Sequence, residues 1–303
     1  MRKKMVQLKK FFKKVLSLNA GQARLFMDER EEGMYTILDV RQPAEYEKEH
    51  IPGAKLVPLP DLNNSLDELD PEKPTIVHCA IGGRSRVAVQ LLSGFGFKEV
   101  YNLEGGIKAW QGNKATGPVE LNLDEGGIKA WQGNKATGPV ELNLDLIRGD
   151  ETLNEIIKLA YGMEQGLQRF YETMHSRTKD SELADFLWKM ADVEQIHKKA
   201  LFDLLAIVDS PEQDLESFEA EVDSDIMEGG FDMTAFMEKN EPFLHTFSDV
   251  IDVAMMLETQ ALDLYLRFAE KSTKPPAKDV LFKIGKEERN HLASLGRLLE
   301  EKK

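Results

Sequence analysis

Glutamate and histidine recur at one spacing in the second half of this 303-residue sequence, and the whole pattern occurs twice. In each copy a lone glutamate is followed, 30 residues later, by a Glu-x-x-His element. The six residues are Glu164, Glu194, His197, Glu258, Glu288 and His291. A separation of three places a glutamate and a histidine on one face of a helix, one turn apart. The pattern therefore restricts this half to helical folds that bring both copies together.

The rest of the second half has helical periodicity and almost no strand signal. Ile156, Ala160 and Met163, for example, belong to an apolar stripe at helical intervals. We predict four helices, over about 150–178, 181–209, 246–272 and 276–302. A longer acidic connection, 210–245, separates the second helix from the third. A four-helix bundle with one long crossover has the ferritin-like topology.

Four carboxylates and two imidazoles facing the interior of an apolar bundle would be very costly to bury without partners. Two cations would remove that cost, and oxygen and imidazole ligands suit iron or manganese. Cys79 is the single cysteine of the chain. One cysteine cannot form an intrachain disulfide, a multi-thiolate zinc site or an iron–sulfur cluster. We therefore expect two iron ions, or iron with manganese, held by glutamate and histidine.

Residues 148–300 resemble the rubrerythrin-like members of the ferritin superfamily. The resemblance rests on the repeated Glu-x-x-His elements and on Tyr171 and Tyr265, which each follow a lone glutamate by seven residues. It implies that Glu194 and Glu288 bridge two metals, that the lone glutamates are terminal ligands, and that each histidine binds one metal. It also implies that the tyrosines hydrogen-bond around the centre and that the domain reduces peroxide or oxygen species.

Two departures from that family matter. Typical rubrerythrins carry a four-cysteine rubredoxin module, which this chain cannot build, so electrons must come from an external donor. They also carry a further carboxylate on the third helix, where this chain has Ala261. A non-catalytic iron-binding protein, or a bundle that serves as a dimerisation scaffold, therefore stays open as an alternative.

The first half alternates short β-branched segments with helical stretches. Strands are predicted over 36–40, 75–79 and 99–103, and a helix over 84–94. Such alternation is typical of a small α/β domain with a parallel sheet. The fold class is thus a two-domain chain, in which a parallel-sheet α/β domain precedes an all-α four-helix bundle.

Cys79 ends the second of these strands and opens a loop that leads into a helix. The N–H groups of such a loop and of the helix N-terminus favour a thiolate. Arg84, five residues further on, can add a fixed positive charge. We predict a substrate-binding loop that consists of Ala80, Ile81, Gly82, Gly83 and Ser85. An inert buried cysteine is the alternative interpretation of this position.

Residues 15–115 resemble a single-domain rhodanese, a sulfurtransferase. The shared elements are Leu-Asp-Val-Arg at 38–41, Glu-Tyr at 45–46, His-Ile-Pro-Gly-Ala at 50–54, Cys-x4-Arg at 79–84 and Leu-Glu-Gly-Gly-Ile-x-x-Trp at 103–110. The resemblance implies that Cys79 carries a persulfide between a sulfane-sulfur donor and a thiol acceptor, with Arg84 stabilising the anions. Phosphatases of related pattern place arginine where this chain has Ser85. A degenerate docking domain and a sulfur sensor remain alternatives.

A perfect duplication joins the two halves, because residues 104–124 are identical to residues 125–145. Identity without drift favours a recent or artificial duplication over a structural repeat. We expect domains over 1–115 and 146–303, with 116–145 as a linker. Trp110 should be buried in the first domain, and Trp131 should be exposed or loosely packed.

Charge separates the two halves as well. Residues 1–145 carry 20 basic and 20 acidic side chains, whereas residues 146–303 carry 19 and 33, which accounts for the net charge of −14. An acidic half argues against nucleic-acid binding. The basic leader lacks a signal-peptide core, and nothing in the sequence is apolar enough to span a membrane. We expect a cytoplasmic protein that forms a homodimer through the helical domain.

Overall fold

The computed structural model describes residues 15–110, 136, 139–208, 214–222, 225–241, 244 and 246–301. The basic leader, Trp131 and most of the duplicated segment lie outside these residues. The described chain divides into two compact units. The first comprises 15–110 with 136 and 139–140, and the second comprises the described residues from 141 onward.

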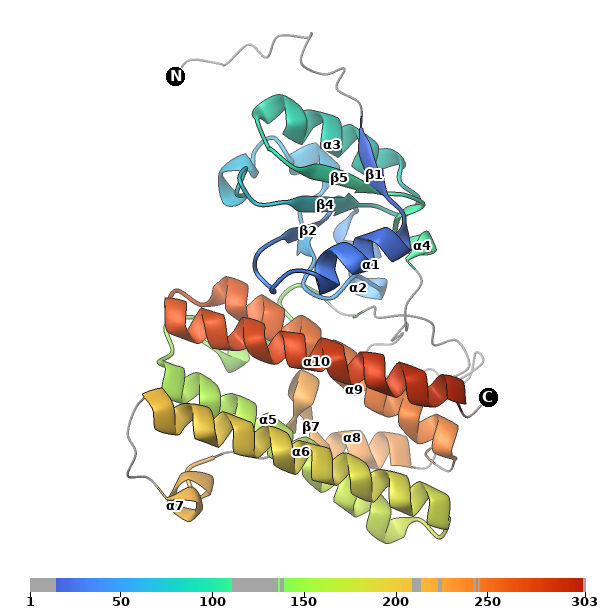
Figure 1. Cartoon of the computed structure of the whole chain (residues 1–303), viewed down its shortest axis with the longest axis vertical. Coiled ribbons are helices and arrows are strands. Elements are labelled where there is room, and N and C mark those ends of the chain that lie inside the picture. The colour runs from blue at the N-terminus through green and yellow to red at the C-terminus, as the bar shows by residue number, and fades with distance from the viewer. Residues whose placement is uncertain are drawn as a thin grey trace. The chain divides into compact units, whose positions relative to one another are not determined.

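The first unit is built on a five-stranded parallel sheet with strand order β1-β5-β4-β2-β3 (Figure 1). Its strands are β1 Leu16–Leu18, β2 Thr36–Asp39, β3 Lys55–Leu56, β4 Thr75–His78 and β5 Val100–Leu103. The three predicted strands are β2, β4 and β5, each within a residue of its expected limits. The edge strands β1 and β3 were not predicted, because three and two residues are too short to show a periodicity.

Helices cover both faces of this sheet. Neighbouring residues point to opposite faces: Val77 of β4 packs in the core beneath α3, whereas Ile76 packs in the core beneath α1. Figure 1 shows α3 and α1 on opposite sides of the sheet. The helices are α1 Ala20–Asp28, α2 Pro43–Lys48, α3 Gly83–Phe95 and α4 Gly106–Ala109. Trp110 is buried, as predicted.

The second unit contains four long helices at the predicted positions: α5 Leu153–Arg177, α6 Ser181–Val208, α9 Phe247–Lys271 and α10 Pro275–Glu301. Helix α5 packs mainly against α6, and α9 packs mainly against α10. Both pairs begin alike, since Thr152 and Thr246 cap the N-termini of α5 and α9 in capping boxes. Each cap lies 12 residues before the lone glutamate of its pair. The two copies of the sequence pattern thus correspond to two equivalent helical hairpins.

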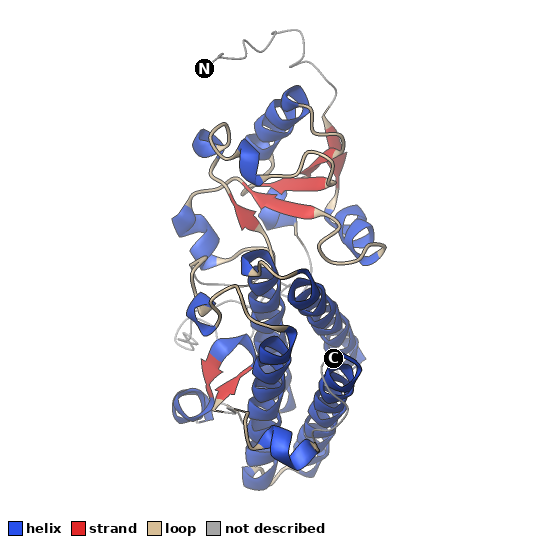
Figure 2. Ribbon diagram, turned by 90° about the vertical axis from the view of Figure 1, so that its left-hand side faces the viewer, coloured by secondary structure: helices blue, strands red, loops and turns tan. Residues whose placement is uncertain are grey.

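The crossover between α6 and α9 carries structure of its own. It contains α7 Leu215–Glu219, the antiparallel strands β6 Ile226–Met227 and β7 Phe231–Asp232, and α8 Met233–Asn240. A short 3₁₀ turn, Glu228–Gly230, joins the two strands into a hairpin. Figure 2 shows this hairpin in red beside the long helices. Among the described helices, none is long and apolar enough to cross a membrane.

Candidate functional site

Cys79 lies directly after β4, and its thiol is buried within the loop that leads to α3. The Sγ atom accepts a hydrogen bond from the N–H of Gly82 at 3.1 Å and from the hydroxyl of Ser85 at 3.5 Å. Gly82 adopts φ of 94°, a left-handed conformation that glycine tolerates and that turns the loop around the sulfur. The loop is therefore shaped to surround a sulfur anion with donors.

The electrostatics of the loop favour the thiolate. Burial by itself raises the pKa of Cys79. The hydroxyl of Ser85 and the N–H groups of Ser85, Ile81 and Gly82 outweigh that effect and hold the pKa below its ordinary value. The Oγ atom of Ser85 also lies 2.6 Å from Oδ1 of Asn102 on β5, so the one hydroxyl proton is shared between that oxygen and the sulfur.

The loop that follows β5 packs against the cysteine loop. The N–H groups of Ile107 and Lys108 donate to the carbonyls of Cys79 and Ala80, at 2.8 and 3.2 Å. Gly106 has φ of 59°, and a Cβ atom there would lie 2.3 Å from the Cys79 carbonyl oxygen. Only glycine allows the two backbones to approach so closely. The Gly-Gly-Ile segment after β5 therefore fixes the position of the cysteine loop.

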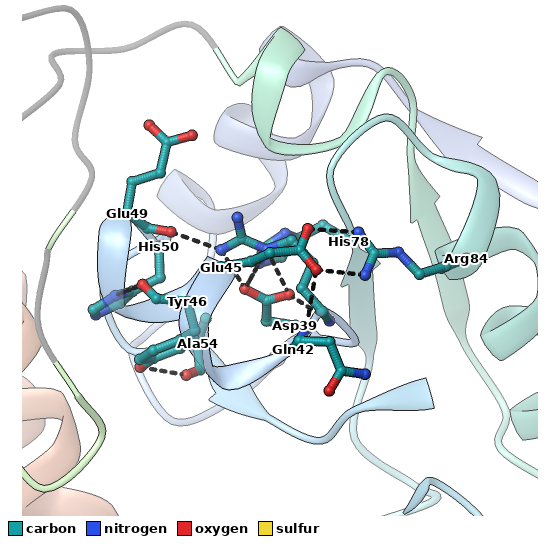
Figure 3. A network of polar contacts seen from close by, with 10 residues as sticks. Asp39, Gln42, Glu45, Tyr46, Glu49, His50, Ala54, His78 and Arg84 are labelled. Atoms are coloured by element: carbon teal, nitrogen blue, oxygen red, sulfur yellow. Dashed lines mark hydrogen bonds and ion pairs between the residues drawn. The ribbon is translucent and has the colours of Figure 1, made fainter. Parts of the chain in front are cut away.

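Arg84 follows the loop on the first turn of α3 and forms a bidentate ion pair with Glu45 of α2. Its two terminal nitrogens donate to the Glu45 carboxylate at 2.6 and 2.7 Å. This bond and the Cys79 charge both raise the pKa of Arg84, and the Arg84 partner lowers the pKa of Glu45 to about 2. Figure 3 shows the Glu45 carboxylate facing the guanidinium. Glu45 therefore fixes Arg84 near the sulfur, a contact that sequence analysis missed across 39 residues.

A fully buried ion pair lies under this site. Asp39 accepts three side-chain hydrogen bonds from Arg41, the shortest at 2.7 Å (Figure 3). Nε2 of His78 lies 3.6 Å from the same carboxylate. Burial nevertheless lowers the pKa of His78 to about 4, so that this imidazole is neutral at pH 7. These groups hold the carboxyl ends of β2 and β4 in place.

The six metal-ligand candidates meet inside the four-helix bundle as two triads. The first consists of Glu164, Glu194 and His197, and the second consists of Glu258, Glu288 and His291. Nδ1 of His197 lies 3.0 Å from Glu194, and Nδ1 of His291 lies 3.3 Å from Glu258. The two imidazole rings stack 4.1 Å apart. The predicted residues of both halves are thus brought together into one centre.

The polar atoms of this centre fit metal ions. All four carboxylates are at most 3% exposed. Oxygen atoms of Glu164, Glu194 and Glu288 are buried and have no hydrogen-bond partner among the described residues. Burial raises the pKa of Glu164 and of Glu194 to about 8, and it raises that of Glu288 well above its usual value. Divalent cations would replace the protons on these carboxyl groups and bind the oxygens that lack hydrogen bonds.

A fifth acidic residue lies in the centre and was missed by sequence analysis. Glu228, in the turn of the crossover hairpin, is 1% exposed and within ligand distance of Glu164 and Glu288. Before two glycines in an acidic segment, a glutamate looks like part of an exposed turn. Ala261, on the third long helix, is packed in the apolar core.

The two tyrosines differ in their contacts. The hydroxyl of Tyr265 donates to Glu228 at 3.4 Å, whereas the buried hydroxyl of Tyr171 has no partner among the described residues. Burial and the surrounding carboxylates raise the pKa of both phenols well above the ordinary value. Both tyrosines are therefore neutral groups beside the ligands.

The chain thus joins a cysteine loop at the end of a parallel strand to a helical bundle with two Glu-Glu-His triads. The family model described as a rhodanese-like domain matches residues 22–113. The rubrerythrin family model matches residues 129–205 and 155–299, together more than half of the chain. The chain belongs to the rubrerythrin family and carries a rhodanese-like domain fused before the bundle.

Individual relatives match the first unit. The thiosulfate sulfurtransferase GlpE of Coxiella burnetii is 38% identical over 86 residues, which are 28% of this chain and 80% of GlpE. The Rhodanese-like/PpiC domain-containing protein 12 of Arabidopsis thaliana is 42% identical over 96 residues, 29% of each chain. The uncharacterized protein YqhL of Bacillus subtilis is 42% identical over 76 residues, 25% of this chain. The chain spans 29% of the Arabidopsis protein and 60% of YqhL, less than two thirds of either.

A solved structure also resembles the first unit. It is the crystal structure of a rhodanese-like domain protein from Staphylococcus aureus, with 29% sequence identity and a TM-score of 0.30. The match covers 32% of this chain and 91% of that chain.

Proposed function

We propose that the first unit is a sulfurtransferase that forms a persulfide on Cys79. The observation that carries the proposal is the ring of hydrogen-bond donors around the Cys79 sulfur, which lowers the pKa of the thiol despite its burial. The match to GlpE, a protein named as a thiosulfate sulfurtransferase, supports the same chemistry. We assign this activity to residues 1–115, the metal chemistry to 146–303, and the connection to 116–145.

The reaction proceeds in two displacements. The Cys79 thiolate attacks the outer sulfur of a donor such as thiosulfate, a new S–S bond forms, and sulfite leaves with the electron pair of the broken bond. A thiolate acceptor then attacks the outer sulfur of the persulfide and returns Cys79 to its thiolate form. The loop N–H groups stabilise the sulfur anion in both steps, and Arg84 offsets the charge of the incoming donor.

A thiosulfate-loading experiment tests this proposal. Intact-mass spectrometry of the treated chain should show a gain of one sulfur atom, located by peptide mapping at Cys79. Cys79→Ser should show no gain. A wild-type chain that gains no sulfur, under conditions in which GlpE does, would rule out the proposed activity.

We propose that the second unit holds two iron ions and reduces peroxide or oxygen with electrons from an external donor. The observation that carries this proposal is the set of buried carboxylate oxygens without hydrogen-bond partners beside two imidazoles. Glu194 and Glu288 are assigned as bridging ligands, with Glu164, Glu258 and the two histidines as terminal ligands. When bound, iron would supply the electrons that cleave the O–O bond.

The chain itself holds the ligand side chains in position, leaves one side of the centre open, and places neutral phenols beside it. Helices α5, α6, α9 and α10 fix the ligand side chains before any metal arrives, since all four carboxylates are already buried at their places. His197 and His291 are partly exposed, at 15% and 20% of their side chains, and they mark the side from which small molecules could enter. The neutral phenol of Tyr171 could donate a hydrogen bond to a small molecule beside the ligands, and that of Tyr265 donates to Glu228.

Metal analysis tests the second proposal. After anaerobic loading, we expect about two iron ions per chain. Glu194→Ala should lose metal, whereas Glu182→Ala, an exposed glutamate of the same helix, should retain it. Equal metal content in all three chains would exclude the proposed centre. Iron binding without turnover of peroxide would leave a non-catalytic iron-binding protein.

We also infer a cytoplasmic location and a homodimer formed through the bundle. The single cysteine supports a reducing compartment. Trp188 and Ile196 on α6 are 52% and 66% exposed, which supports self-association of this unit. Light scattering of the full chain measures the oligomeric state, and a monomer at micromolar concentration would refute the dimer.

A further inference from the structure

Glu228 stands apart from the other acidic residues of the metal centre, because it comes from the crossover and not from a long helix. Its side chain is 1% exposed. Its carboxylate, one from Glu164 of α5 and one from Glu288 of α10 offer oxygen atoms within 4.8 Å of one another. Glu164 and Glu288 belong to different triads. Glu228 therefore lies where a single carboxylate can reach metals held by both.

The hairpin turn aims this side chain into the bundle. Strands β6 and β7 pair through Ile226 with Asp232 and Met227 with Phe231, so the turn contains only Glu228, Gly229 and Gly230. Both glycines have left-handed φ values, of 75° and 81°. Such a turn reverses the chain immediately after Glu228 and leaves its side chain buried.

The β6–β7 hairpin is held in place by contacts with α5, with α9 and with the segment that precedes α5. A Cβ atom on Gly166 of α5 would lie 2.5 Å from the carbonyl oxygen of Ile226, so the missing side chain allows β6 to rest on the helix. The side-chain amide of Asn143 donates to the Gly229 carbonyl at 2.8 Å. Tyr265 of α9 donates to Glu228 itself. These contacts would be an unusual support for an exposed loop.

Glu228 also has no counterpart in the duplicated ligand pattern. Each of the six triad residues has an equivalent 94 residues away, as with Glu164 and Glu258, or Glu194 and Glu288. Glu228 lies in the crossover between the two halves and has no such equivalent among the triads. Burying a further carboxylate among four others raises the energy of the folded chain unless a cation compensates it.

We propose that Glu228 is a seventh ligand of the metal centre, and that metal binding thereby fastens the crossover hairpin to the bundle. This inference rests on the proposed two-metal centre. It makes the crossover the part of the fold that responds to metal: without cations, Glu228 faces other carboxylates, and with cations it is held by them. The ordering of the hairpin should therefore depend on metal, whereas that of the capped long helices should not.

Cobalt(II) added anaerobically to the full chain provides the probe, because its visible absorption reports the ligands around each ion. Three chains are compared: the wild type, Glu228→Gln, which keeps the shape of the side chain, and Glu216→Gln, an exposed glutamate of the same crossover. For each chain, cobalt stoichiometry, affinity and absorption are measured. Hydrogen–deuterium exchange of the segment 226–232 is followed with and without cobalt.

We expect the wild type and Glu216→Gln to bind about two ions and to show slower hairpin exchange when loaded. Glu228→Gln should bind at least one ion about tenfold more weakly or worse, with an altered absorption band and no metal-dependent slowing of exchange. Gly166→Ala, which displaces β6 without altering a ligand, should also lose that slowing. A Glu228→Gln chain that matches the wild type in affinity, absorption and exchange would overturn the inference and leave the two-metal centre intact. A wild type that binds no cobalt would overturn both.

Discussion

The cysteine loop and the cluster of buried glutamates in the bundle have opposite electrostatics. Around Cys79, neutral N–H groups, a hydroxyl and an arginine are placed to favour one negative charge. In the bundle, five buried carboxylates crowd together, and the pKa values of Glu164 and Glu194 rise to about 8. The cysteine site therefore has its stabilising hydrogen-bond donors built in, whereas the bundle needs protons or cations from outside.

The centres also differ in how the chain builds them. The donors to the Cys79 sulfur lie within six residues of it, and contacts from Asn102, Ile107 and Lys108 fix the loop that carries them. The metal centre collects side chains between Glu164 and His291 from four helices and a hairpin. A site whose donors are close in sequence depends on a few supporting contacts, whereas a centre assembled over such a span depends on the packing of the whole unit.

The largest expected effect is that of Cys79→Ser, which should abolish sulfur transfer and leave the metal centre unchanged. Cys79→Ser removes the nucleophile and should lower thiosulfate sulfurtransferase activity by about 10³-fold or more. Iron content and peroxide turnover of the same variant should equal those of the wild type. A coupled loss of metal would show that the centres are not independent, contrary to the comparison above.

The second prediction concerns the stability of the metal-free chain. Carboxyl groups whose pKa rises from 4.5 to about 8 on folding bind more protons in the folded state between those values, so stability falls as pH rises through that window. With a chelator present, the melting temperature of the bundle should drop by about 5 °C or more between pH 5 and pH 8. Bound iron should abolish most of this dependence, as calorimetry of loaded and metal-free chains would show.

The third prediction tests the support behind the cysteine loop. A Cβ at Gly106 would lie 2.3 Å from the Cys79 carbonyl oxygen, so Gly106→Ala should displace the loop and lower sulfur transfer by about tenfold to a hundredfold. Gly96→Ala is the matched control, because Gly96 also has a positive φ but its Cβ would meet no atom within 4 Å. Similar activity losses in both variants would point to backbone strain and not to the loop.

Sequence reasoning succeeded where the signal is periodic or contiguous. The four long helices and the strands β2, β4 and β5 follow from periodicity, and Cys79 with its loop follows from adjacent residues. Glu228 escaped because its placement depends on a two-strand hairpin too short to leave a pattern. Glu45 escaped because a partner 39 residues distant is chosen by the fold. In both cases the side chain comes from an element, the crossover hairpin or α2, that lies outside the sequence motif used to predict the site.

The smallest expected effect measures how much of the Cys79 environment comes from one hydroxyl. The hydroxyl proton of Ser85 is shared between Oδ1 of Asn102, 2.6 Å from Oγ, and the sulfur, 3.5 Å from Oγ, so its hydrogen bond to the sulfur is long and weak. Removing a donor to a thiolate destabilises the charged form, so Ser85→Ala should raise the pKa of Cys79 by about one unit or less. The pH profile of iodoacetamide alkylation measures this shift, since only the thiolate reacts. Ser93→Ala, elsewhere on α3, should leave the profile unchanged. If Ser85→Ala also left it unchanged, the backbone N–H groups alone would account for the lowered pKa, and the cysteine site would be still more local than its contacts indicate.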